Sequence, residues 1–159
     1  MPRPFQSIVF PLTGSYFHDE LTKQIDLSRT KIRSIQYQWK WNTHERHSRV
    51  QRLGACVARA RSRNVMVEVI LHEESPSKHL TRINSISGDA LARLGCQIRH
   101  RRTAGLLHTK LWIIDNKLTF VGSHNISGRS LGLNEEVTVM IDSEPFASFM
   151  NTYFDNLWA

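Results

Sequence analysis

The chain has 159 residues, of which 40% are hydrophobic and 22% are charged, a profile that excludes a disordered segment and suits a globular domain with one core. Its 21 lysines and arginines outnumber its 14 aspartates and glutamates, and the formal net charge of +7 favours polyanionic partners, whether DNA, RNA or an anionic membrane surface. Two cysteines, Cys56 and Cys96, are too few for a disulfide framework and are expected to be buried thiols.

The N-terminal stretch from Met1 to Phe17 contains only short apolar runs, of which Ile8-Val9-Phe10 is the longest. It lacks the apolar region of a signal peptide, and no segment of the chain has the length of a membrane span. We therefore expect a cytoplasmic protein.

The next segments predict a helix followed by a strand. Residues 17–27 carry apolar side chains at helical spacing, at Phe17, Leu21 and Ile25. Residues 32–41 alternate in the manner of a strand, and one face carries Ile35, Tyr37, Trp39 and Trp41. Aromatic side chains in this pattern can stack on bases, but facing a core is the commoner arrangement and is expected here.

The middle of the chain predicts a capped helix and a buried strand. Ser48 is expected to cap a helix that Asn64 closes in the left-handed conformation, with a buried stripe of Val50, Leu53, Val57 and Ala60. Residues 65–71 are apolar on both faces, which is typical of a central strand covered on two sides. Residues 72–86 are polar and predict no element, and a short helix is expected from Asp89 to Leu94, ending at Gly95.

Strands dominate the rest of the chain until a final helix. They are expected at residues 96–100, 106–114, 118–121 and 137–141, with a tight turn at residues 115–117. Ser143-Glu144-Pro145 marks the start of a helix whose apolar face comprises Phe146, Phe149, Met150, Tyr153, Phe154 and Leu157. Strands interleaved with helices, without a repeat or a low-complexity linker, predict one α/β domain over residues 1–159.

The arginines form three clusters along the chain. They lie at Arg46, Arg49 and Arg52, at Arg59, Arg61 and Arg63, and at Arg99, Arg101 and Arg102. Neutralising phosphates with such side chains releases condensed counterions, so the clusters favour a polyanionic partner.

One segment combines residue types that carry chemistry. Its spacing reads H-x-K-x4-D-x6-G-S-x-N, with polar positions at His108, Lys110, Asp115, Ser123 and Asn125. Residues two apart on a strand share a face, so His108 and Lys110 are expected to point the same way. The turn at residues 115–117 reverses the chain, so the next strand runs antiparallel and is expected to place Ser123 and Asn125 beside His108 and Lys110. An imidazole, an ammonium, a hydroxyl and an amide then converge, which suits anionic oxygens around a nucleophile or proton carrier.

This pattern resembles the HKD motif of the phospholipase D superfamily at every defined position. Residues 91–115 resemble that family's approach to its motif, and residues 63–67 resemble its R-G-V-x-V strand entry, with Asn64 in place of glycine. Residues 134–136 are similar to its downstream N-x-E. The resemblance implies a phospholipase D-like sandwich, with a mixed central β-sheet flanked by helices on both faces. It also implies a homodimer, because the chain holds one copy of a motif that works in pairs.

The resemblance implies a role for each residue. A neutral His108 attacks phosphorus to give a phosphohistidine, while the partner subunit's His108 protonates the leaving oxygen. Lys110 and Asn125 hold the non-bridging oxygens, and Ser123 supports them. Glu136 orients the catalytic imidazole. The two lysines of a dimer replace the charge of a metal ion, so neither a metal nor a cofactor is expected.

Asp115 is the sixth candidate catalytic residue of the motif, although at a turn a carboxylate more often caps backbone N–H groups. Other polar positions are expected to be bystanders. His124 lies at a variable position and is expected to be a neighbour of the site. Residues 122–130 lack the spacing and the lysine of a phosphate-binding P-loop. The clusters at residues 44–47 and 72–74 lack the H-E-x-x-H spacing of a zinc site, so solvated surface is expected there.

The leading functional prediction is an endonuclease of low sequence specificity that hydrolyses DNA or RNA. The alternative is a phosphodiesterase of the same superfamily that acts on an anionic phospholipid such as cardiolipin, although the sequence shows no N-terminal membrane segment or amphipathic anchor. A second alternative is a non-catalytic nucleic-acid-binding module with a vestigial site, against which the intact motif argues.

Overall fold

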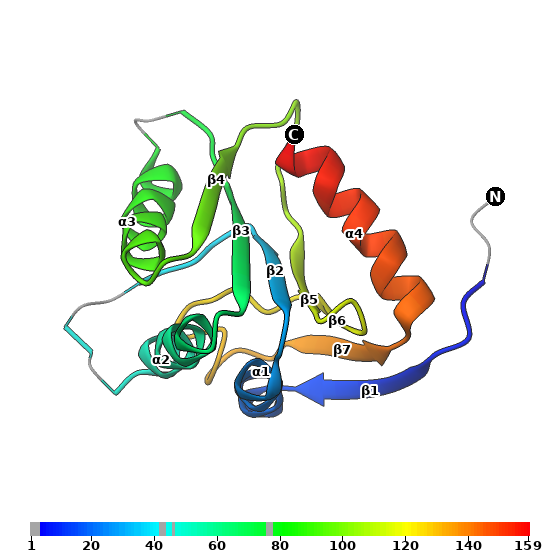
Figure 1. Cartoon of the computed structure of the whole chain (residues 1–159). Helices are drawn as coiled ribbons and strands as arrows, with labels where there is room; N and C mark the ends of the chain where they lie inside the picture. The colour runs from blue at the N-terminus through cyan, green and yellow to red at the C-terminus, as the bar shows by residue number, and fades with distance from the viewer. Residues whose placement is uncertain (1–3, 42–43, 46, 76–77) are drawn as a thin grey trace.

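A seven-stranded mixed β-sheet runs through the computed structural model, which describes residues 4–41, 44–45, 47–75 and 78–159 (Figure 1). Its strands are β1 (Ile8–Thr13), β2 (Lys31–Gln36), β3 (Met66–His72), β4 (Gln97–Arg101), β5 (Lys110–Ile114), β6 (Leu118–Gly122) and β7 (Val137–Asp142). They lie in the order β1-β7-β6-β5-β2-β3-β4. The pairs β2–β3 and β3–β4 are parallel, and the other pairs are antiparallel.

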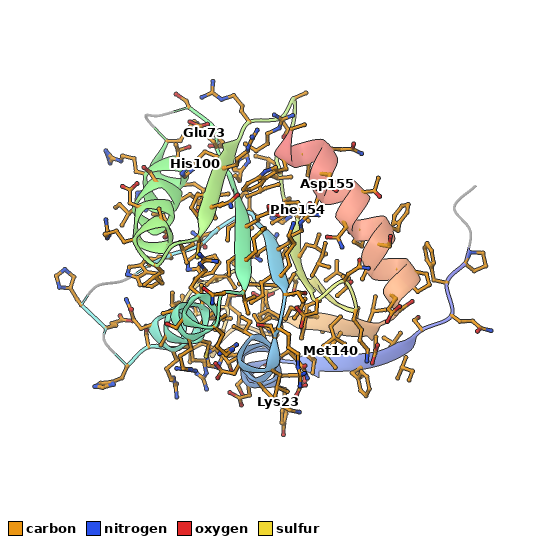
Figure 2. All side chains as sticks on the ribbon, in the orientation of Figure 1. Lys23, Glu73, His100, Met140, Phe154 and Asp155 are labelled. Atoms are coloured by element: carbon orange, nitrogen blue, oxygen red, sulfur yellow. The ribbon has the colours of Figure 1, made fainter. Side chains whose placement is uncertain are left out.

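Helices cover both faces of this sheet. On one face lie α1 (Ser15–Leu27), α2 (Arg49–Ser62) and α3 (His79–Arg93), over a core that includes Phe17, Leu53, Leu91 and Trp112. On the other lies α4 (Glu144–Trp158), whose Phe154 points toward the strands and packs with Ile35, Ile70 and Leu111 (Figure 2). This arrangement confirms the predicted α/β fold with helices on both faces.

Local signals account for the ends of α2 and α4. The Ser48 Oγ accepts the Gln51 N–H at 3.3 Å, and Asn64 has a φ of 64° just beyond α2. At α4, the Ser143 Oγ accepts the Phe146 N–H at 3.4 Å, and proline lies in the first turn. Both predicted helix starts are confirmed, because a side-chain oxygen satisfies an N–H group that the helix leaves free.

The strand predicted at residues 32–41 is shorter and is buried on both faces. β2 ends at Gln36, and Trp39 then forms an isolated bridge with Ile126. Ile35 packs on the α4 side, whereas Trp39 is fully buried among residues of the opposite core. The prediction of one shared face is wrong, because the alternation of faces ends where regular pairing ends. The prediction that Trp39 faces a core is confirmed.

α3 starts well before the predicted Asp89. Part of its buried face is polar, since Asn84 and Ser87 are fully buried. Asn84 accepts the Trp39 N–H at 3.0 Å and donates to the Tyr37 carbonyl at 2.9 Å. A helix that buries hydrogen-bonded polar groups lacks a continuous apolar stripe, so hydrophobic spacing does not predict its first half.

Two strands differ from the sequence prediction. β5 begins at Lys110 rather than Leu106, so His108 precedes the strand. β1 is not predicted at all; it lies at the edge of the sheet and contains Pro11, which an edge strand tolerates. Among the helices of the described ranges, none is long and apolar enough to span a membrane.

Candidate active site

The side chains of His108 and Lys110 meet just before the start of β5. The Lys110 Nζ lies 2.9 Å from the imidazole Nδ1, 3.0 Å from Nε2 and 2.9 Å from the His108 carbonyl oxygen. The backbone N–H of Tyr37 donates to the Thr109 carbonyl at 3.1 Å, which fixes this segment beside the end of β2. Lys110 is only 7% exposed, whereas His108 is exposed, so the imidazole faces solvent above a buried ammonium.

Tyr37 forms one wall of this pair. Its ring centroid lies 4.5 Å from that of His108, and the Lys110 Nζ lies 5.1 Å from the Tyr37 ring. On its other side the ring is 5.3 Å from the buried imidazole of His72. Tyr37 was expected to face a core, yet its ring contacts the site. Its position in the sequence, in the same alternating pattern as Trp39 and Trp41, did not distinguish it from a core residue.

Electrostatics favour a neutral imidazole at this position. Burial lowers the pKa of His108, and the charges of Lys110 and His72 lower it further. Burial also lowers the pKa of Lys110, and the nearby carboxylate of Glu136 opposes that shift. The pair therefore combines an unprotonated ring nitrogen with an adjacent cation, which is the state required of a nucleophile that attacks an anion.

Ser123 and Glu136 form a second hydrogen-bonded pair. The Ser123 Oγ donates to Glu136 Oε2 at 2.5 Å and accepts the Val137 N–H at 3.0 Å. The other carboxylate oxygen accepts from Ser130 at 2.8 Å and from Asn134 at 3.3 Å. Burial tends to raise the pKa of Glu136, but these hydrogen bonds outweigh it and lower the pKa. The carboxylate is thus charged and acts on Lys110 through space. Within the described residues its hydrogen bonds go to these partners and not to the His108 imidazole, which Glu136 was expected to orient.

Asn125 is tied to the same network through its backbone. Its N–H donates to the Ser130 Oγ at 2.9 Å, and Ser130 in turn donates to Glu136. The side-chain Oδ1 of Asn125 is buried and has no hydrogen-bond partner within the described part of the chain. Ser130, like Tyr37 and His72, was not predicted to belong to the site. For Ser130 the reason is that a serine in a polar loop carries no spacing signal.

His124 points away from these groups. It is 1% exposed, its Nδ1 lies 2.7 Å from the Thr138 hydroxyl, and its Nε2 lies 3.0 Å from the Gly14 carbonyl. Its ring stacks on Phe17 at 4.3 Å. Burial lowers its pKa, and the Gly14 carbonyl and Glu136 oppose that shift. Both ring nitrogens have partners, so His124 fixes the start of α1 and is a neighbour of the site, as expected.

Asp115 is not brought to the other candidates. It lies at the opposite end of β5 from Lys110, in a turn where Asp115 and Asn116 both have positive φ, 53° and 51°. Its carboxylate accepts the N–H groups of Arg29, Thr30 and Lys31 at 2.8, 2.9 and 3.1 Å. Burial tends to raise its pKa, but these hydrogen bonds outweigh it. This geometry gives Asp115 a structural role and no contact with His108, although the motif includes it.

The two histidine clusters differ from each other. His72 is 1% exposed, so the expectation of a solvated surface is wrong for it; Glu74 Oε1 lies 3.7 Å from its Nε2. In the cluster at residues 44–47, His44, Glu45 and His47 are exposed, and Arg46 lies outside the described residues. Across the residues that the structure describes, no three His, Cys, Asp or Glu side chains are grouped to hold a metal.

The two cysteines lie apart from these groups. Cys56 and Cys96 are both free and buried, which confirms the prediction from the sequence. Burial raises the pKa of Cys96 to about 11, so its thiol stays protonated and unreactive at neutral pH.

Comparison with known sequences identifies lipid-synthesising relatives. The family model described as "Cardiolipin synthase, PLD-like domain" matches residues 21–158. Cardiolipin synthase A from Proteus mirabilis is 59% identical over 44 residues, which are 28% of this chain and 9% of that protein. Minor cardiolipin synthase ClsB from Bacillus subtilis is 38% identical over 89 residues, which are 56% of this chain and 22% of that protein. The matched part is therefore under a quarter of either relative.

Comparison with solved structures finds matches over nearly the whole chain. The phospholipase D family member Nuc from Salmonella typhimurium superposes with a TM-score of 0.79 at 18% identity, covering 96% of this chain and 95% of that one. NucT from Helicobacter pylori superposes with a TM-score of 0.68 at 18% identity, covering 98% and 96%. At this level of identity, the likeness shows a common fold.

Proposed function

This chain belongs to the family of cardiolipin synthase PLD-like domains, within a superfamily of phosphodiesterases, and on that premise we propose that it is a nuclease that hydrolyses DNA or RNA. Residues 1–159 act together as one phosphodiesterase domain. The observation that carries the proposal is the contact of the exposed imidazole of His108 with the buried amine of Lys110. The formal net charge of +7 favours a polyanion as the substrate.

The proposed reaction proceeds through a phosphohistidine. A ring nitrogen of His108 attacks phosphorus, the bond to the leaving oxygen breaks, and that oxygen takes a proton from the partner subunit's His108. Water then attacks the phosphorus of the phosphohistidine and gives a proton to the partner's His108, while the P–N bond breaks and releases His108 and the phosphate monoester. Lys110 neutralises charge that builds on the non-bridging oxygens.

Two further groups assist in this proposal. The buried Oδ1 of Asn125 has no hydrogen-bond partner among the described residues, and in this proposal the N–H groups of the same amide donate to a phosphate oxygen. Glu136 fixes the Ser123 hydroxyl and holds Lys110 in its charged form. The positive charge that phosphoryl transfer needs then comes from side chains, so we propose that neither a metal nor a cofactor takes part.

The proposed enzyme is a homodimer with one shared active site. The mechanism needs two imidazoles, and within the described residues the imidazole near His108, that of His72, is buried behind Tyr37. Apolar side chains lie exposed around the site, which supports an interface there. Leu106 is 59% exposed, and Tyr153, whose hydroxyl lies 3.3 Å from the Thr109 hydroxyl, is 38% exposed.

A lipid phosphodiesterase is the second candidate. The observation in its favour is sequence identity, since the relatives at 59% and 38% identity are cardiolipin synthases, whereas Nuc and NucT are 18% identical. A phospholipid headgroup presents the same phosphodiester to His108 and Lys110, so the site chemistry serves both substrates.

One experiment separates the two candidates. Plasmid nicking and hydrolysis of a fluorescent cardiolipin analogue are measured side by side with wild-type protein and with His108→Ala. We expect wild-type protein to nick the plasmid and to hydrolyse little of the lipid, and we expect His108→Ala to lose the nicking activity. Lipid turnover without nicking would establish the second candidate, and loss of neither activity in His108→Ala would refute the proposed site.

A further inference from the structure

A basic cleft of about 690 Å³ adjoins the candidate active site. Its walls continue two segments of that site, since Gln38 and Lys40 follow Tyr37, and residues 127–129 follow Asn125. Backbone hydrogen bonds hold the two walls together: the Ile126 N–H donates to Gln38 at 3.0 Å, and the Lys40 N–H donates to the Ile126 carbonyl at 2.7 Å. Three residues of extended chain span about 10 Å, so the Lys40 backbone in the wall of the cleft lies within that distance of Tyr37.

The cleft is strongly cationic. Among the described residues, its lining includes one carboxylate, from Glu45, and four cations, from Lys40, Arg49, Arg52 and Arg129. None of these cations takes part in an ion pair between residues that the structure describes. The N-terminus of α2 also borders the cleft, and its first turn contains no acidic residue, so the helix dipole adds to the positive potential.

Five of the six arginines in the other two clusters are occupied in maintaining the fold, whereas the Nε of the sixth, Arg101, is buried without a hydrogen-bond partner among the described residues. In the second cluster, Arg59 is paired at 2.7 Å with a carboxylate of α1, and Arg61 and Arg63 donate to backbone carbonyls. In the third, Arg99 and Arg102 also donate to backbone carbonyls. The described arginines of the first cluster, Arg49 and Arg52, line the cleft. Within the described part of the chain, their guanidinium groups form no ion pair that would stabilise the fold, so another role must account for these charges.

The Arg49 guanidinium lies against the loop opposite, at Gly132. A side chain at Gly132 would collide with the Arg49 guanidinium, so glycine at this position leaves room for it. The carbonyl of Arg49 lies 3.0 Å from the His18 Nε2, which anchors its backbone.

From these observations we infer that the cleft is a subsite for the phosphates of a nucleic-acid strand that lie beyond the one being cleaved. This inference rests on the proposed function and extends it. These cations are too far from the active site to bind the phosphodiester that is cleaved. They can bind only a substrate that carries additional phosphates, such as a nucleic-acid strand. Acyl chains would need apolar walls, and the apolar side chains among the described residues of the cleft are Val50 and Leu133.

The test compares two pairs of charge-removing substitutions. Arg52→Gln/Arg129→Gln removes two exposed cations of the cleft. The control, Lys23→Gln/Arg59→Gln, removes one cation from α1 and one from the C-terminal part of α2. The Lys23 side chain points into solvent at the bottom of Figure 2. Both pairs change the net charge equally, so a difference between them reports on position and not on overall charge.

Two quantities are measured for each protein. The first is binding of a single-stranded oligonucleotide across salt concentrations, in a His108→Ala background that prevents cleavage. For the cleft variant, the slope of log affinity against log salt should fall by about 1 to 2, and for the control it should not change. The second is the ratio of oligonucleotide turnover to turnover of bis(p-nitrophenyl) phosphate, which has a single phosphate. This ratio should fall at least several-fold in the cleft variant alone.

Failure of the inference and failure of the proposed function give different results. If wild type hydrolyses both substrates and the cleft variant matches the control in slope and ratio, the subsite does not exist. If the cleft variant instead loses binding to cardiolipin vesicles and keeps oligonucleotide binding, the inference is also overturned. If wild type hydrolyses neither substrate, the proposed function fails, and the salt slope of binding still decides whether the cleft holds a strand.

Discussion

The imidazole Nδ1 of His72 accepts the backbone N–H of Leu107 at 3.3 Å, one residue before His108. Both residues are buried, at 1% and 4% exposure, so this hydrogen bond is shielded from water. His72 also packs against Tyr37, whose ring contacts His108. His72 therefore holds the backbone that leads to His108 as well as the ring that forms its wall.

We expect His72 to act as a positioning residue. His72→Leu should lower kcat by about ten- to a hundredfold, because a small displacement of His108 spoils the line of attack. His72→Asn keeps an acceptor for the Leu107 N–H and should retain most of the activity. Since His72 also lowers the pKa of His108, the acidic limb of the pH profile should move to higher pH in His72→Leu. Equal losses in both variants, with no change in the profile, would contradict this role.

The pH dependence of hydrolysis should show an unusually acidic limb. Burial and then the charge of Lys110 lower the pKa of His108 from its ordinary value of 6.5. Attack requires the unprotonated ring, so kcat/KM should fall as the pH falls, with a midpoint below 6.5. Lys110→Met removes one cause of the shift, and NMR titration of His108 in that variant should give a higher pKa than in wild type. A midpoint above 6.5 for wild type would contradict the proposed electrostatics.

Activity should survive the removal of divalent metal. Lys110 supplies positive charge at the phosphate in the proposed mechanism, so nicking by stripped enzyme should continue in excess EDTA. The matched control is Lys110→Gln, which should be inactive with or without added metal. Complete loss in EDTA that Mg²⁺ or Zn²⁺ restores would refute the mechanism.

Mixing active and inactive chains should show whether the site is shared. A mixed dimer of wild type and His108→Ala has one imidazole where two are needed and should be nearly inactive. Equal amounts of both chains, unfolded together and refolded, give about a quarter fully wild-type dimers by random pairing. Activity near a quarter of the wild-type value supports a shared site. Activity near a half, or a monomer by light scattering, indicates that each His108 works alone.

Asp115 should matter for stability more than for chemistry. Asp115→Ala removes the acceptor of three N–H groups and should lower the free energy of unfolding by about 1–3 kcal/mol. Asp115→Asn tolerates the same positive φ and keeps one acceptor oxygen, so it should cost less. Specific activity of the folded protein should stay near wild type in both variants. A large loss of kcat without a loss of stability would show instead that Asp115 takes part in catalysis.

The stabilising effect of Asp115 also has a defined pH dependence. Its pKa in the folded state is below the ordinary value of 3.8, because the hydrogen bonds from Thr30, Lys31 and Arg29 outweigh the effect of burial. Its contribution is therefore fully present above pH 3.8 and is lost as the pH falls through the lower, folded value. Denaturant titrations at several acidic pH values should show that Asp115→Ala abolishes this part of the acid sensitivity.

Local chemistry in the sequence determined much of this protein. The caps at Ser48 and Ser143 and the left-handed Asn64 depend on neighbours within a few residues, so their side chains predict them directly. The spacing of His108 and Lys110 likewise indicated the family, since a two-residue separation keeps two side chains together even where the strand has not yet begun.

Tertiary structure decided everything that depends on partners far along the chain. Asn84 forms part of a buried helix face because it meets the backbone of Trp39, which no periodicity of α3 encodes. Three similar arginine clusters separate into fold-supporting and unpaired groups because acceptors happen to lie near two of them. Asp115 leaves the site because β5 places the two ends of the motif at opposite ends of one strand. Hydrophobic spacing reports which residues avoid water, whereas the partners of a polar side chain are fixed only when distant segments meet.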